Sequence, residues 1–279
     1  VEVALSTRNI HTKNFMWTTN FNFAYNNNKI LKEALREDAL EPGREGYPVG
    51  ALFALKTAGL DEEGYPMFEG KDGKAVSAME FFKLQEWGFG ATDLTARERR
   101  ELYTYVGTAD CPYTGGFNNT FTYKAFELGV NFSFDFGGKV RSQPTYSIVD
   151  FDKGRNTNRD ILNRWTPENT ETIFPVLLSQ NERLDEYMWY SNQNEIYRNL
   201  DIWIRDLNYV RLQNIRLGYT LPTNFSRKLG MTSATIAIEG RNLLVFGSSY
   251  KNYLDPETMS NAYATPAPKS VTLSLNLNF

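Results

Sequence analysis

The sequence has little of what enzymes use for chemistry. Its 279 residues include one histidine, His11, and one cysteine, Cys111. We expect His11 in a short turn, where no Ser-His-Asp, Cys-His or multi-histidine zinc arrangement forms around it. No glycine-rich loop precedes a Lys-Ser or Lys-Thr pair, so a phosphate cradle is not indicated. These absences predict a protein that is not an enzyme and has no catalytic residues, cofactor or metal site.

Two further absences narrow the class. The net charge is only −3 and the basic residues are dispersed, so nothing indicates nucleic acid as a partner. No apolar run approaches the roughly 18 to 20 residues that a membrane-spanning helix needs, which excludes a helical membrane protein. A membrane barrel stays open, because its strands hide their lipid face by alternation. The lone Cys111 cannot form an internal disulfide, and we expect it to be structural or incidental.

What the chain has is aromatic residues and alternation. It contains 19 Phe and 16 Tyr. Its last ten residues, 270–279, place Val, Leu and a terminal Phe on one face and only Ser, Thr and Asn on the other. A soluble edge strand would usually carry charges on its polar face. An amphipathic last strand that ends in Phe is typical of outer-membrane β-barrels, in which one face meets lipid and the other a wet lumen.

Six more segments alternate in the same way, giving seven predicted strands. In two of them the pattern gives further detail. The phase slips near Gln213 and Asn214, which predicts a β-bulge there. Glu239 and Arg241 share a polar face and could pair in the lumen. Trp17 is an expected interfacial residue, as are Tyr123 and Tyr219. The predicted strands are 1–10, 15–25, 115–123, 126–136, 206–221, 234–246 and 270–279.

The connections between these strands alternate between short and long. The short ones are 11–14, Lys124–Ala125 and 222–231. The long ones are 31–112 and 139–204, followed by a moderate loop at 246–267. Outer-membrane barrels have this asymmetry, with short turns in the periplasm and long loops outside. We therefore place 31–112 and 139–204 outside the cell.

The first long insertion shows signs of its own structure. An Asp72-Gly73 pair predicts a hairpin turn. Residues 77–87 and 95–106 have helical spacing, and Thr95 with Glu98 forms a predicted capping box at the start of the second segment. The acidic residues of the turns, Asp61 to Glu63 and the Asp255 and Glu257 pair, lack calcium-loop spacing. We expect them to be solvated turn residues.

Five blocks of sequence, in order, resemble a known family. They are 115–140, 163–175, 204–222, 238–257 and the terminal Phe279. Together they resemble the C-terminal third of SusC/RagA-type TonB-dependent transporters of the Bacteroidota outer membrane. The absence of an initial Met fits an expectation that the chain is a piece of a longer precursor.

The resemblance implies an all-β fold: a transmembrane antiparallel β-barrel of 22 strands with long extracellular loops, of which residues 1–279 form the C-terminal part. The plug and the N-terminal strands would be absent. It also implies an importer of glycans or peptides that works with a SusD-like surface lipoprotein and is energised by TonB through the missing N-terminal part. The barrel would contact outer-membrane lipid, and a dimer of transporter–lipoprotein pairs is compatible with it. Phe279 would be an assembly signal.

Aromatic residues of the expected extracellular loops are the candidates for substrate or lipoprotein contact. Flat rings there could stack on sugars or anchor the lipoprotein, but for any single ring we favour packing within the loops themselves. The candidates are Trp87, Phe89, Trp165, Tyr187, Trp189 and Tyr190.

Two other functions remain alternatives. A passive outer-membrane porin would share these strands, and a plug domain in the preceding sequence would discriminate against it. A soluble carbohydrate-binding β-sandwich would need strands at a regular spacing of about 8 to 12 residues, which the long insertions interrupt.

Overall fold

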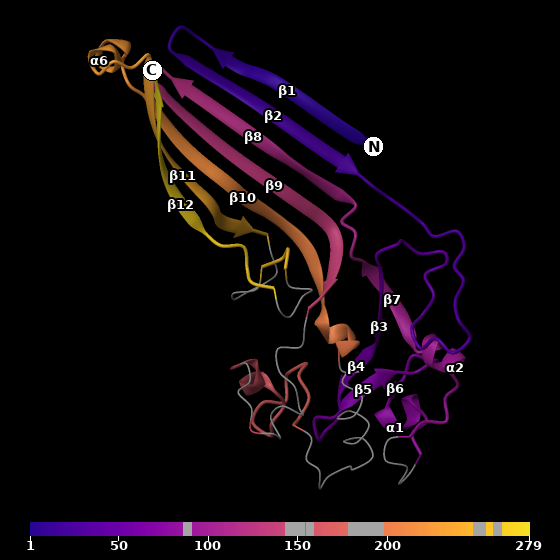
Figure 1. Ribbon diagram of the computed structural model, residues 1–279. Coiled ribbons are helices and arrows are strands. Elements are labelled where there is room, and N and C mark those ends of the chain that lie inside the picture. The colour runs from indigo at the N-terminus through magenta and orange to yellow at the C-terminus, as the bar shows by residue number, and fades with distance from the viewer. Residues whose placement is uncertain (86–90, 143–153, 155–158, 178–197, 248–254, 259–263) are drawn as a thin grey trace. The chain divides into compact units, whose positions relative to one another are not determined.

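A computed structural model describes residues 1–85, 91–142, 154, 159–177, 198–247, 255–258 and 264–279 (Figure 1). The chain divides into two compact units, each assembled from segments far apart in the sequence. We call them the sheet unit, Val1–Asn27 with Asp110–Gly138 and Asp206–Phe279, and the insertion unit, Asn28–Ala109 with Lys139–Arg205.

The sheet unit is built on seven strands that lie side by side in the order of the sequence (Figure 1). The pairs β1–β2, β2–β8, β8–β9, β10–β11 and β11–β12 are antiparallel, as expected for strands joined in an up-and-down pattern. All seven predicted strands are therefore confirmed. They are β1 (Glu2–His11), β2 (Phe15–Tyr25), β8 (Tyr113–Tyr123), β9 (Phe126–Arg141), β10 (Ile204–Thr220), β11 (Ser233–Phe246) and β12 (Ser270–Asn278).

The two faces of this sheet differ in polarity, as the alternation predicts. Phe117 of β8 pairs with Phe132 of β9, and their rings stack at 4.7 Å. Ile238 of β11 pairs with Leu273 of β12, and Leu273 is 75% exposed. A soluble sheet would cover such a face with a second layer. Here large apolar side chains on one face of the sheet stay accessible.

The register contains the predicted irregularity. Between β10 and β11 the pairing shifts between Leu212 and Asn214, so the bulge predicted near Gln213 is confirmed. The extra residue lies in β11, where Asn242 and Leu243 together stand opposite Gln213, and Asn242 has a positive φ of 53°. A second shift, between Arg8 and Ile10 of β1, was not predicted.

The short connections lie next to one another at one end of the strands. Lys124, with a positive φ of 53°, forms the predicted tight turn between β8 and β9. Its N–H donates to the Asn14 carbonyl of the neighbouring turn at 2.9 Å, and the N–H of Thr220 donates to Ala125 at 2.9 Å. The third short connection contains a helix, α6 (Thr223–Lys228). His11, expected in a turn, is instead the last residue of β1.

The insertion unit contains two small sheets and short helices. The sheets are β3 (Ala51–Leu55) with β7 (Tyr103–Thr108), and β4 (Thr57–Leu60) with β5 (Pro66–Glu69) and β6 (Ala75–Val76). The helices are α1 (Ala78–Phe81) and α2 (Ala96–Glu101), with 3-10 turns at Arg159–Asn163 and Asp201–Trp203. In the part of the chain that the structure describes, no helix is both long and apolar enough to span a membrane.

The two helices predicted from spacing, at 77–87 and 95–106, are each confirmed only in part. The capping box at Thr95 and Glu98 is confirmed, and so is the turn at Asp72-Gly73, where Gly73 has a φ of 77°. The prediction of a helix through residue 106 is wrong, because α2 ends at Glu101 and Tyr103 begins β7. Aromatic and β-branched residues favour strands when a partner strand is available, and β3 supplies one.

Candidate functional site

A buried apolar cluster holds the insertion unit together. Leu55 and Phe68, from β3 and β5, are at most 1% exposed, as are Leu200 and Trp203 from the second insertion. Polar bonds join the same segments: the Asp201 carboxylate accepts from the N–H and hydroxyl of Thr57 at 3.2 and 2.6 Å. The two insertions, far apart in sequence, thus form one layer with its own core.

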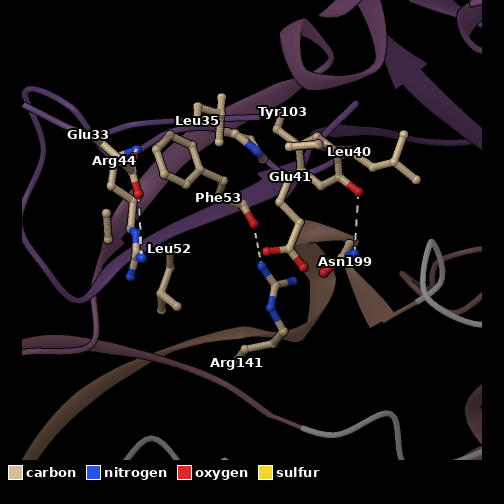
Figure 2. A pocket seen from close by; sticks show the side chains of 13 residues that line it. Glu33, Leu35, Leu40, Glu41, Arg44, Leu52, Phe53, Tyr103, Arg141 and Asn199 are labelled. Carbon is tan, nitrogen blue, oxygen red and sulfur yellow. Dashed lines mark hydrogen bonds and ion pairs between the residues drawn. The ribbon is translucent and has the colours of Figure 1, made fainter. Parts of the chain in front are cut away.

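The first cavity of this unit has a volume of about 590 Å³ (Figure 2). Its wall combines apolar side chains from residues 35–53 with charged ones. Arg44 pairs with Glu33 at 3.6 Å, and the Asn199 amide donates to the Tyr103 hydroxyl at 3.3 Å. Arg141 lies at the end of β9, and Figure 2 shows its guanidinium directed at the main chain of Phe53.

A second cavity, of about 740 Å³, lies between β5, α1 and α2. Its four lysines each pair with a carboxylate. The pairs are Lys56–Glu69 at 2.5 Å, Lys71–Glu101 at 3.6 Å, Lys74–Asp72 at 3.1 Å and Lys83–Glu98 at 3.0 Å. Because these charges are compensated inside the protein, this cavity offers a ligand little unpaired charge.

Of the six aromatic residues predicted as contacts, the structure describes only Trp165. Its half-buried indole lies against Gly64, where a Cβ would sit only 2.4 Å from the ring. The N–H of Trp165 donates to the Phe174 carbonyl at 3.0 Å. The ring therefore packs within the insertion unit, and its contact with a ligand stays a prediction. Trp87, Phe89, Tyr187, Trp189 and Tyr190 lie outside the described residues.

The polar face of the sheet unit is a ladder of side-chain hydrogen bonds between β9 and β10. The Asn131 amide donates to Asn214 at 2.5 Å, and the Gln213 amide donates to Ser133 at 2.7 Å. The Tyr209 hydroxyl donates to Asp135 at 2.5 Å. Each bond joins residues more than 70 positions apart, so the bonds fix the register of the two strands. On β11 the predicted pair of Arg241 with Glu239 is confirmed at 2.5 Å.

A buried ion pair, which we call the latch, ties residues 255–258 to this polar face. The Arg211 guanidinium, 1% exposed, donates to Asp255 and, at 2.8 Å, to Glu257. The prediction that Asp255 and Glu257 are solvated is therefore wrong for Asp255, which is 8% exposed. Local sequence could not reveal this pair, because its members lie 44 residues apart.

Hydrogen bonds set the ionisation of the Asp255 carboxyl. Burial acts to raise its pKa. The N–H groups of Glu257 and Ala267 and the Arg211 guanidinium oppose burial, and the net effect lowers the pKa below its usual value. The carboxylate stays charged, as a salt-bridged anion does. In the described residues no group of three or more His, Cys, Asp or Glu side chains could hold a metal ion.

Two further predicted residues are described. The half-buried Cys111 has its sulfur 4.0 Å from the Leu207 carbonyl oxygen. Burial, with the nearby Asp135 charge, raises the pKa of this thiol to about 11, so it is an unreactive thiol near neutral pH. Phe279 is 85% exposed, and its role as an assembly signal stays a prediction.

Several known proteins are similar to this chain over its whole length. No family model matches the chain. It is 27% identical to TonB-dependent receptor P3 of Formosa agariphila over all of this chain and 28% of that protein. It is 22% identical to TonB-dependent receptor SusC of Bacteroides thetaiotaomicron over all of this chain and 26% of that protein. Among solved structures, the chain is similar to the RagAB peptide importer in its open-open state, with a TM-score of 0.70 and 21% identity. The match covers all of this chain and 28% of that chain.

The sheet with one accessible apolar face and one hydrogen-bonded polar face is that of an outer-membrane β-barrel protein. More particularly, the chain is part of a SusC/RagA-type TonB-dependent receptor of the outer membrane. It spans 26 to 30% of the length of the curated relatives it matches. This family is one of transporters and not of enzymes, in agreement with the sequence prediction.

Proposed function

We propose that the chain forms part of an energised importer, in which the sheet unit is a segment of a 22-stranded barrel wall. The observation that carries the proposal is the two-faced sheet. Its apolar face, 75% exposed at Leu273, suits lipid, and its polar face, with the Asn131–Asn214 ladder, suits a wet lumen. TonB would supply energy through a part of the protein outside this chain.

The insertion unit would lie outside the cell. Its 31–112 and 139–204 segments would meet the substrate and a SusD-like lipoprotein that caps the mouth. The loop aromatics Trp87, Phe89, Trp165, Tyr187, Trp189 and Tyr190 would contribute to these contacts, and Phe279 would mark the protein for insertion. A dimer of transporter–lipoprotein pairs is compatible with this arrangement.

The resemblance of the sequence to SusC/RagA-type transporters implies glycans or peptides as the substrate class. The similar solved structures are described as a peptide importer and a peptide transporter, RagAB. This description supports a peptide as substrate, at 21% identity. The glycan alternative stays within the proposal, because the family resemblance implies either class.

The two rival functions differ in what they require. A soluble β-sandwich needs a second sheet over the apolar face, whereas Ile238 is 48% exposed and Leu275 is 60% exposed. A passive porin would keep the same sheet but would need no energy.

The test is energy-dependent uptake in cells that carry the full-length gene. Fluorescein-labelled casein peptides and labelled maltooligosaccharides are the probes. We expect uptake of one probe class that ends when the protonmotive force is collapsed, when TonB is deleted, or when the adjacent lipoprotein gene is deleted. Uptake that persists without protonmotive force would establish a porin and contradict the proposal.

A further inference from the structure

One cation in the first cavity of the insertion unit, Arg141, is held by carbonyl oxygens. Arg141 donates from Nη1 to the Arg198 carbonyl at 3.0 Å and from Nη2 to the Phe53 carbonyl. Carbonyl oxygens satisfy N–H groups but carry no net charge. Within the described part of the chain, Arg141 forms no ion pair, although its guanidinium is always protonated.

Of the other charges in this cavity, the Glu41 carboxylate attracts the Arg141 guanidinium without forming an ion pair with it (Figure 2). Arg44 and Glu33 pair with each other at 3.6 Å. Glu41 lines the cavity from an exposed position, and among the described residues its carboxylate accepts no hydrogen bond and forms no ion pair. The second cavity differs, because each of its lysines has a carboxylate partner. Arg141 is thus an anchored cation on the cavity wall, and only the exposed Glu41 carboxylate offsets its charge, without an ion pair.

The anchoring prepares Arg141 to bind an anion. Its two carbonyl bonds fix the planar guanidinium before any ligand arrives, so a carboxylate would gain a charge-assisted bond without the cost of ordering this side chain. The N–H groups of the planar guanidinium also match the two oxygens of a carboxylate better than they match a single acceptor atom.

The remaining wall favours a peptide over a sugar acid. Leu35 and Leu40 are 43% and 50% exposed and, with Leu52, offer apolar contact to a side chain next to the carboxylate. Sugars prefer a flat aromatic ring with a free face. The Phe53 ring, in contrast, already packs edge-to-face with Tyr47 at 5.1 Å and Tyr105 at 5.8 Å.

We propose that this cavity binds the terminal carboxylate of a short peptide through Arg141, with an apolar residue against Leu35 and Leu40. The inference rests on the proposed function, because it assumes that the insertion unit meets the substrate outside the cell. It adds the substrate group and the residue that recognises it. Glu41, which attracts Arg141 from the same cavity, would compete with the ligand carboxylate and weaken its binding.

The test uses the full-length receptor, purified with its lipoprotein where the two copurify. The probes are the labelled pentapeptide Ala-Ala-Leu-Ala-Leu with a free carboxyl end and the same peptide with an amidated end. We expect amidation to weaken binding about tenfold, the size of a lost hydrogen bond between charged groups. In Arg141→Gln, the two peptides should bind equally.

A second variant covers the chance that Arg141→Gln disturbs the main chain it anchors. Glu41→Gln changes an exposed side chain, and it should strengthen binding of the free acid about two- to fivefold and leave the amide unchanged. Arg36→Gln is the control, since Arg36 is exposed, pairs with Asp38 at 2.6 Å and does not line the cavity. It should keep the full difference between acid and amide.

Three results would overturn the inference: equal binding of acid and amide to the unmodified receptor, no effect of Glu41→Gln, or displacement of the peptide by oligoglucuronate at lower concentration than by unlabelled peptide. The last would assign the cavity to a sugar acid. Each can occur while uptake still depends on protonmotive force, in which case the proposed function stands and the assignment of the cavity fails.

Discussion

At the scale of single residues, the two faces of β12 predict opposite responses to the same charge. Leu273 lies opposite Ile238 on the apolar face, and Thr272 lies opposite Glu239 on the polar face. In the full-length protein, Leu273→Arg should cost about 2–4 kcal/mol in lipid. Thr272→Arg should cost far less, because it gains a neighbouring carboxylate. Denaturant unfolding in lipid vesicles compares the two, and equal penalties would show that the faces are wrongly assigned.

The capping box of α2 predicts a specific response to acid. The Thr95 N–H, followed by Lys83 and the Thr95 hydroxyl, lowers the pKa of Glu98 from 4.5 to about 2. Since the folded pKa lies below the unfolded value, the stabilisation is present above about pH 4.5. It is lost as the pH falls toward about 2.

Hydrogen exchange of the α2 amides, corrected for intrinsic rates, measures this response. The unmodified protein should lose α2 protection progressively over this range, whereas Glu98→Gln, which cannot ionise, should show no such change. A loss of protection of equal size in both proteins would contradict the role of the Glu98 charge.

Residues were predictable from the sequence where the signal is local. The residues of the capping box, Thr95 and Glu98, are three positions apart. The turn at Lys124 lies between two segments in which apolar and polar residues clearly alternate. The buried state of Asp255 was not predictable, because Arg211 reaches it only after β10 and the loop are placed together. The apolar wall of the first cavity and the placement of Arg141 in it depend on tertiary structure in the same way.

At the scale of elements, the latch should hold residues 255–258 against β10. Arg211→Met would leave Asp255 buried without a counter-charge, which typically costs about 3–5 kcal/mol. Arg241→Met is the matched control, because the Arg241–Glu239 pair has an exposed arginine, and such pairs contribute about 0–1 kcal/mol.

Unfolding midpoints of the two full-length variants, with hydrogen exchange of 255–258, give the comparison. Arg211→Met should lower the midpoint and expose the segment, and Arg241→Met should do neither. Similar behaviour of the two variants would mean that the latch contributes no more than a surface pair.

Whole strands were easier to predict than the insertions. Period-two alternation specifies both the strand and its buried or exposed face, so β1, β2, β8, β9, β10, β11 and β12 follow from the sequence, as does the irregular register near Gln213. In the insertion unit, spacing alone misplaced residues 103–106, because pairing with β3 outweighs a helical pattern. Short elements depend more on their partners than on their own sequence.

At the scale of the whole molecule, seven strands should not form a barrel alone. The outer strands of the sheet, β1 and β12, each have one neighbour among the described residues. Unpaired backbone groups in hydrocarbon cost several kcal/mol each. Residues 1–279 expressed alone should therefore aggregate in detergent. A monomer whose mobility on a gel changes on heating would contradict this expectation.

We propose that the sheet crosses the outer membrane with the insertion unit outside the cell and the short turns in the periplasm. Labelling of single cysteines in the full-length protein with a membrane-impermeant maleimide, after Cys111→Ala, tests this topology. Asp38→Cys lies in the insertion unit, and Lys228→Cys lies in α6 at the short-turn edge. Asp38→Cys should be labelled on intact cells, and Lys228→Cys should be labelled only after the outer membrane is permeabilised. Labelling of Lys228→Cys on intact cells, with Asp38→Cys protected, would contradict it.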